Sequence, residues 1–312
     1  MRARAVCLIS VLGGAALSDC KAATSYADAR GSLAAEERQA LDGVLGRAGV
    51  DPRTLVVETD LYDVFWRGAA AHASLHGRSD RVASIERATP DLRNAVAIEG
   101  GHVTALRMAG ANLDDLELVA PLTHLVVLDL HDEKIERIDG LDAMAELDHL
   151  DLSGNRIAAI ERVSALHSLR SLYVADNRLQ RLDALAGLTS LEVVNASGNA
   201  IAEISGLTNV PALRALSMER NPIVRIAGLE GAPGLTDLDL SFCQIERLEN
   251  LGTMPKLLYL NLWHNHVRTL AGAEDAKRLI YLGLGDNQSG YGDPESLQIR
   301  DRFCPLRFCV FM

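Results

Sequence analysis

Residues 147–177 read LDHLDLSGNRIAAIERVSALHSLRSLYVADN, and this stretch contains the pattern that decides the fold. An aliphatic pair followed by an asparagine occurs in it twice, 22 residues apart: Leu150, Leu152, Asn155 and then Leu172, Val174, Asn177. Apolar residues two apart share one face of a β-strand. An asparagine side chain both donates and accepts hydrogen bonds, so it can satisfy the backbone of its own turn and of the next coil's turn. Each unit therefore predicts a short strand followed by a tight buried turn.

The 22-residue period continues from Leu106 to Tyr281 without an insertion, which makes eight full units. The central strand column is Leu106, Leu128, Leu150, Leu172, Val194, Leu216, Leu238, Leu260 and Leu282. The asparagine ladder is Asn155, Asn177, Asn199, Asn221, Asn265 and Asn287, with Ala111, Glu133 and Cys243 at the positions that break it. Further apolar columns three residues apart favour a short helical or 3₁₀ return segment. One unit cannot bury its apolar side alone, so the units are expected to stack into a solenoid.

This pattern resembles the leucine-rich repeat family, and most of all its 22-residue class in bacterial internalins and eukaryotic phosphatase-regulating repeat proteins. The family consensus, roughly LxxLxxLxLxxNxIxxIxxL, is matched by LDHLDLSGNRIAAI at residues 147–160. The resemblance implies an α/β solenoid: a leucine-rich repeat horseshoe with about nine parallel concave strands, short helical or 3₁₀ convex segments and a helical N-terminal cap. It is specific for the fold and says little about the ligand.

Composition narrows the function classes. Acidic residues outnumber basic ones 42 to 31, giving a formal net charge of −11. Such a chain lacks the positive surface that grips a phosphate backbone, so nucleic acid is not an expected partner. No nucleophile elbow, phosphate-binding loop, HExxH or paired CxxC motif occurs. We therefore expect no catalytic residues, no metal and no cofactor.

The N-terminus predicts export. Two arginines precede an apolar run over residues 5–17, which has the length of a signal-peptide core and is too short to cross a bilayer. Residues 1–23 are therefore predicted to be a signal peptide. Cys20 lies in LSDC, which resembles the lipobox of bacterial lipoproteins, although Asp19 departs from that pattern. Free secretion, a lipid anchor at Cys20 and a retained ordinary helix all stay open. The expected location is secreted, periplasmic or cell-surface, with no membrane span.

The flanks of the repeats are expected to cap the solenoid. We assign residues 24–98 to a helical N-terminal cap, 99–292 to the solenoid and 293–312 to a C-terminal tail or cap. Helices are predicted over 33–49, 60–75 and 79–88, and a hairpin over 94–108. The tail could plug the last coil or be an aberrant terminus with an exposed apolar patch, and Cys304 and Cys309 in it could form a disulfide.

Positions flanking the strand leucines should face away from the core, on the concave face, and these are the candidate partner-binding residues. The late-coil set is Asp237, Asp239, Phe242, Tyr259, Trp263, His264 and Tyr281. The early-coil set is Asp129, His131, His149, Asp151 and Tyr173. Exposed aromatics on a rigid sheet favour binding of a protein, or of a glycan, although the rings could instead stack on one another or lie under the tail. The early-coil set, with Asp132, offers metal-ligand types, but charges on a solvated face are usual.

The sequence thus predicts a non-enzymatic protein-interaction module that is secreted or surface-anchored and binds a partner on the concave face. Two alternatives stay open. One is an effector or enzyme with its activity in residues 24–98. The other is a regulatory scaffold for a phosphatase, against which the signal peptide argues because that partner would be cytosolic.

Overall fold

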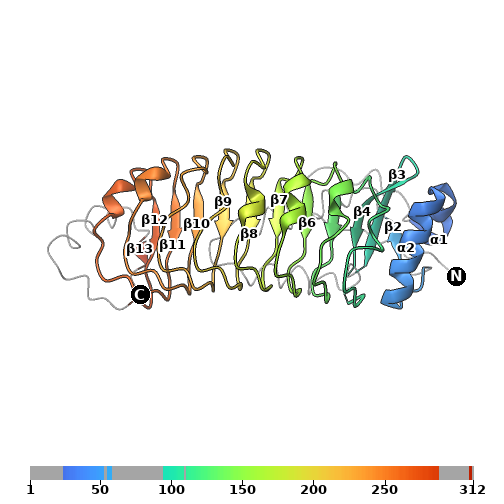
Figure 1. The fold of residues 1–312 in the computed structure, drawn as a ribbon, viewed down its shortest axis with the longest axis horizontal. Coiled ribbons are helices and arrows are strands. Elements are labelled where there is room, and N and C mark those ends of the chain that lie inside the picture. The colour runs from blue at the N-terminus through green and yellow to red at the C-terminus, as the bar shows by residue number, and fades with distance from the viewer. Residues whose placement is uncertain (1–23, 53–54, 58–93, 109, 288–308, 311–312) are drawn as a thin grey trace, which may run out of the picture.

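The computed structural model describes residues 24–52, 55–57, 94–108, 110–287 and 309–310. Figure 1 shows an elongated solenoid in which the strands lie side by side from the N-terminal helices to the C-terminal end. The strands form one 13-stranded sheet in chain order. They are β1 (Thr24–Ser25), β2 (Val56–Val57), β3 (Ala95–Glu99), β4 (His102–Arg107), β5 (Val127–Asp129), β6 (His149–Asp151), β7 (Ser171–Tyr173), β8 (Val193–Asn195), β9 (Ala215–Ser217), β10 (Asp237–Asp239), β11 (Tyr259–Asn261), β12 (Tyr281–Gly283) and β13 (Cys309–Val310).

The nine strands from β4 to β12 are parallel and keep the 22-residue register. Leu106 pairs with Leu128, Leu128 with Leu150, and so on to Leu260 with Leu282. The predicted set of nine in-phase parallel strands is confirmed. The register follows from the period, because a slip by one residue would turn every strand leucine out of the core.

Five of the eight returns between β4 and β12 contain a short 3₁₀ turn, whereas those from β4 to β5, from β8 to β9 and from β9 to β10 run through turns and bends. The 3₁₀ turns are η3 (Leu141–Ala143), η4 (Glu161–Ala165), η5 (Asp183–Leu185), η6 (Leu251–Thr253) and η7 (Ala273–Asp275). Each buries one or more apolar side chains of the repeat columns, such as Leu141 and Val163. These side chains and the strand leucines belong to one continuous core. The predicted helical or 3₁₀ return segments are therefore confirmed in five coils and are missing from the other three.

The asparagine ladder joins each turn to its neighbour. The Asn155 amide donates to Leu152 O of its own turn and to Leu130 O of the preceding coil, each at 2.9 Å, and its Oδ1 accepts from the Ile135 N–H at 2.9 Å. Each ladder asparagine thus bonds the backbone of the preceding coil. We had expected it to bond the next coil, but the amide points back along the stack. Where the ladder is broken, the carboxylate of Glu133 accepts from the backbone N–H groups of Ala111 and Leu113 at 2.6 and 3.0 Å.

The described helices of the region assigned as the N-terminal cap form a segment that packs against the repeat core. It contains α1 (Tyr26–Ala29), η1 (Arg30–Ser32) and α2 (Ala35–Ala48). The helix predicted over 33–49 corresponds to α2, which ends where Gly49 takes a left-handed conformation with φ 63°. Leu41 and Val44 of α2 share the repeat core. The predicted hairpin is the antiparallel pair β3 and β4. The helices predicted over 60–75 and 79–88 lie outside the described residues.

At the C-terminal end, β13 adds one parallel strand to β12, with Leu282 opposite Cys309. The rest of the predicted tail, Cys304 included, lies outside the described residues, as do the predicted signal peptide and Cys20. Among the described helices, none has both the length and the apolar character needed to cross a membrane.

Candidate functional site

Side chains on the concave face lie in rows that run across the strands. The parallel register places Arg107, Asp129, Asp151 and Tyr173 in one such row. These positions were expected to be exposed, but Asp129, His149, Tyr173 and Asp239 are buried. The reason is that parallel strands lie about 4.8 Å apart, so side chains of neighbouring coils cover one another.

The early-coil set forms a buried charge network. Asp129 pairs with the Nε of Arg107 at 3.1 Å and with the Nδ1 of His131 at 2.6 Å. Burial opposes ionisation of Asp129, but the hydrogen bond from His131 and the nearby positive charges outweigh it, so the pKa of Asp129 lies below its ordinary value. The same hydrogen bond raises the pKa of His131 to about 9. The pair is therefore charged at neutral pH.

Asp151 lies one strand further along the same row. Its carboxylate accepts from the Ser153 N–H at 2.9 Å. Burial, followed by repulsion from Asp129, raises the pKa of Asp151 to about 7. Beside it the rings of His149 and Tyr173 lie 5.2 Å apart. Within the early-coil set, the charges of Asp129 and His131 are thus compensated by partners on the sheet itself.

Sequence reasoning missed Arg107, the cation of this network. Its position 22 residues before Asp129 was the available signal, because that spacing places the two side chains side by side in the register. The early-coil set also yields no group of three ligand atoms in mutual reach. Within the described ranges, the three His, Cys, Asp or Glu side chains whose ligand atoms all lie within 4.8 Å of one another are Glu37, His102 and His124.

The late-coil set brings its rings together. Phe242 and His264 stack with ring centroids 4.1 Å apart at an interplanar angle of 21°. The rings of Trp263 and His264 form a T-shaped pair with centroids 6.3 Å apart, and the ring centroids of Tyr259 and Tyr281 lie 6.2 Å apart. These ring contacts form two groups, one of Phe242, His264 and Trp263 and one of Tyr259 and Tyr281.

Phe242 and His264 lie in a column of left-handed residues that has one member in each coil. Both follow a strand in the left-handed conformation, with φ 55° and 51°. Elsewhere this column holds Gly110, Asp132, Gly154, Asp176, Gly198, Arg220 and Asp286, all with positive φ. Glycine and aspartate enter this region more readily than bulky residues do. Phe242 is nevertheless there and 48% exposed, so neither backbone preference nor core packing explains the ring.

Asp237 and Asp239, the two aspartates of the late-coil set, differ in burial and in hydrogen bonding. Asp239 is buried and accepts from the Ser241 hydroxyl at 2.6 Å and from the Asn261 amide at 3.0 Å. Asp237 is only half-buried and accepts from the Thr236 hydroxyl at 2.6 Å. A negative group that the sequence analysis missed is Asp286, whose carboxylate lies 3.1 Å from the Nε2 of His264. Its signal was the same left-handed column, one coil further on.

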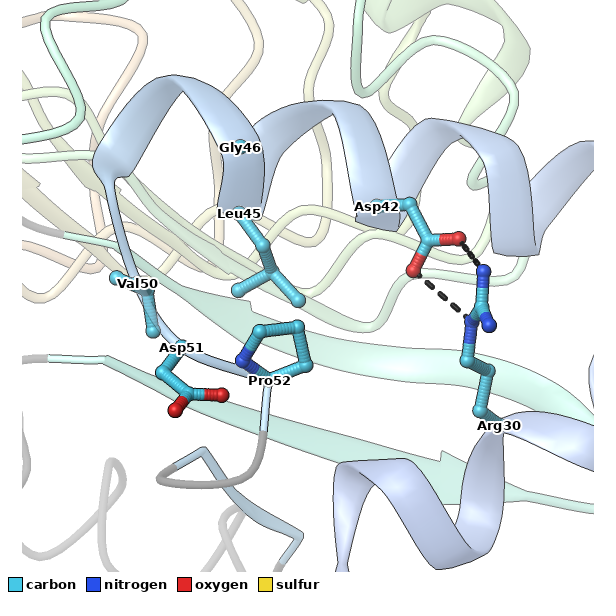
Figure 2. Close-up of a pocket in the computed structure, with 7 residues that line it drawn as sticks. All are labelled: Arg30, Asp42, Leu45, Gly46, Val50, Asp51 and Pro52. Carbon is cyan, nitrogen blue, oxygen red and sulfur yellow. Dashed lines mark hydrogen bonds and ion pairs between the residues drawn. The ribbon is translucent and has the colours of Figure 1, made fainter.

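A separate hollow of about 650 Å³ opens on the N-terminal cap (Figure 2). Its lining is Arg30, Asp42, Leu45, Gly46, Val50, Asp51 and Pro52. Arg30 pairs with Asp42, which also accepts from the Tyr26 hydroxyl at 3.0 Å. Burial, with Asp42 nearby, raises the pKa of Tyr26 to about 12. Among the residues that the structure describes, the lining offers no Ser, Cys or His side chain, and the carboxylate of Asp42 is paired with Arg30.

Among the comparisons with known proteins, the search of solved structures identifies the fold. No protein-family model matches the chain, and no curated protein matches its sequence. Among solved structures, an internalin of Listeria monocytogenes, InlF, superposes with a TM-score of 0.60 at 21% identity, covering 75% of this chain and 68% of that one. Internalin C2 of the same species gives 0.53 at 22%, over 64% and 90%. TLR13, solved with a single-stranded RNA, gives 0.54 at 24%, over 62% of this chain and 30% of that one. The chain therefore has the leucine-rich repeat fold, as the repeat pattern predicted.

Proposed function

We propose that the protein is a non-enzymatic binding module that is exported by residues 1–23 and uses the late-coil set to bind a protein partner. The observation that carries this proposal is Phe242, a 48% exposed aromatic ring held in a left-handed backbone conformation and stacked on His264. Every coil takes the left-handed conformation at this position, but the turn does not require a bulky aromatic side chain there, and non-glycine residues in this conformation are concentrated at functional sites. Trp263, Tyr259 and Tyr281 extend the same aromatic area across two coils.

The arrangement favours affinity. Rings held on a parallel sheet lose little freedom on association, which lowers the entropy opposing binding. Aromatic residues also provide a large share of the energy at protein interfaces. We therefore assign Phe242 and Trp263 as anchors, with Tyr259 and Tyr281 beside them.

The surrounding charges indicate the character of the partner. Asp237 and Asp286 lie next to the aromatic side chains, and the whole chain carries a formal charge of −11. A partner with an apolar contact and basic character fits this surface. The RNA in the TLR13 structure is not carried over to this chain, because an acidic surface repels a phosphate backbone. A glycan is the remaining alternative for the aromatic side chains.

The purified chain lacking residues 1–23 is first used to capture a partner from an extracellular protein extract. The affinity of the chain for the purified partner is then measured. Trp263→Ala should weaken binding by about 30-fold or more, since an anchor residue contributes about 2 kcal/mol or more. Phe242→Ala should act in the same direction. Val224→Ala is the matched control, because Val224 is a comparably exposed apolar residue outside the late-coil set.

Equal affinity of wild type and both aromatic variants for a captured partner would refute the proposed site. Parallel titrations with a glycan array and with single-stranded RNA separate the other ligand classes. Saturable RNA binding that Trp263→Ala abolishes would overturn the assignment of a protein partner.

A further inference from the structure

The N-terminal cap and the first coil meet at a cluster that the proposed function does not use. Glu37 lies on α2, His102 begins β4, and His124 lies in the turn before β5. The Oε1 of Glu37 is 3.2 Å from the Nδ1 of His102 and 3.4 Å from the Nδ1 of His124. Three segments far apart in sequence thus point metal-ligand atoms at one place.

We propose that Glu37, His102 and His124 form a binding site for a divalent transition metal, with Zn²⁺ as the preferred ion. Two imidazole nitrogens and a carboxylate oxygen are a usual ligand set for zinc. In a tetrahedral site with metal–ligand bonds of about 2.0–2.1 Å, neighbouring ligand atoms lie about 3.3 Å apart. The two measured separations from Glu37 match that tetrahedral edge.

Burial of the Glu37 carboxylate supports the presence of a cation at this cluster. The Glu37 residue is only 4% exposed, and its other oxygen accepts from the Val103 N–H at 3.3 Å, which fixes the carboxylate in place. A buried carboxylate needs a compensating positive charge. The rings of His102 and His124 stack with centroids 3.8 Å apart at 27°. Because the lone pair of each ring nitrogen lies in the plane of its ring, ligation of one ion by both Nδ1 atoms requires the rings to turn out of this stack.

The site is open to solvent on one side. The His102 and His124 side chains are 42% and 44% exposed, so an ion can enter and water can complete the coordination. One competing contact exists: the Thr123 hydroxyl lies 3.4 Å from the Nδ1 of His124. Metal binding would replace that contact and would fasten α2 to the first repeat strand.

The experiment is a titration of the full metal-free chain with Zn²⁺ by calorimetry and by thermal unfolding. We expect one high-affinity Zn²⁺ per chain. At a free concentration 100 times Kd, the melting temperature should rise by about 5–10 °C. His124→Ala and His102→Ala should each weaken binding by more than about tenfold, because loss of a ligand should exceed the effect of losing an outer-shell partner.

Two controls keep the result interpretable. His167→Ala removes an exposed histidine remote from the cluster and should leave the affinity unchanged. If His124→Ala alters the circular dichroism of the metal-free chain, His124→Gln replaces it. Co²⁺ in place of Zn²⁺ should give weak visible bands and no intense thiolate band, which separates this site from the cysteines.

Absence of Zn²⁺ binding at micromolar concentrations would overturn the proposal and leave a hydrogen-bonded His–Glu–His cluster. Binding that neither histidine variant weakens would also overturn it, as would a thiolate band. None of these outcomes bears on the concave face, so the proposed function is tested separately.

Discussion

Replacement of Asn221 by leucine tests the ladder that holds neighbouring coils together. The Asn221 residue is 2% exposed, and its amide donates to Ala196 O and Met218 O, both at 2.9 Å. Its Oδ1 accepts from the Ile201 N–H at 3.0 Å. Leucine has a similar volume but makes none of these bonds. The Ile201 N–H and the Ala196 carbonyl of the preceding coil would both lose this partner.

The magnitude follows from these groups. A buried polar group left without a partner costs about 1–3 kcal/mol, so two of them cost roughly 2–6 kcal/mol. Burial of the leucine side chain returns about 1.5–3 kcal/mol at most. With both ranges taken at their midpoints, we expect a net loss of about 2 kcal/mol in the free energy of unfolding.

Urea unfolding followed by circular dichroism measures this loss, and hydrogen exchange locates it. Because repeat arrays are held by interfaces between neighbours, lost protection should centre on the coils around β8 to β10. The control is Gln180→Leu, which replaces an exposed amide and should change stability by less than about 0.5 kcal/mol. Asn221→Leu with the urea midpoint of wild type would refute the reasoning.

Three further predictions follow from single residues. Cys243, at a break in the ladder, is a free buried thiol whose Sγ lies 3.5 Å from Met218 O. An asparagine side chain there would make a stronger hydrogen bond, which adds about 0.5–1.5 kcal/mol. Cys243→Asn should therefore raise the melting temperature measured by calorimetry by about 1–4 °C. Because the pKa of Asp151 is raised to about 7 in the folded state, the folded state loses stability as pH rises from about 4 to about 7. In urea unfolding, Asp151→Asn should therefore be more stable than wild type at pH 8. This difference in stability should shrink as the pH is lowered toward 4. Intact-mass analysis of protein from the native host should show loss of the first 19–23 residues, with added lipid mass if Cys20 is the new terminus; a retained Met1 on cytoplasmic protein would contradict export.

The sequence could predict the solenoid because its physical cause is local and repeated. Each coil meets a neighbour with the same pattern, so a leucine every 22 residues and an asparagine five residues later are enough to specify strand, turn and register. The helix before Gly49 was likewise predictable, since a glycine in the left-handed conformation ends it.

Only the tertiary structure decided which concave side chains are free to act. Tyr173 and Asp239 were predicted as exposed, but neighbouring coils bury them, and burial depends on the size and charge of side chains 22 residues away on both sides. The stack of Phe242 on His264 depends in the same way on a backbone conformation that the pattern does not display. The cluster of Glu37, His102 and His124 joins a helix residue to two histidines one 22-residue period apart, and the strand leucines and the asparagine ladder give no sign of the contact with Glu37. The period determines where the backbone runs, whereas contacts between unlike side chains arise only once that backbone has brought them together.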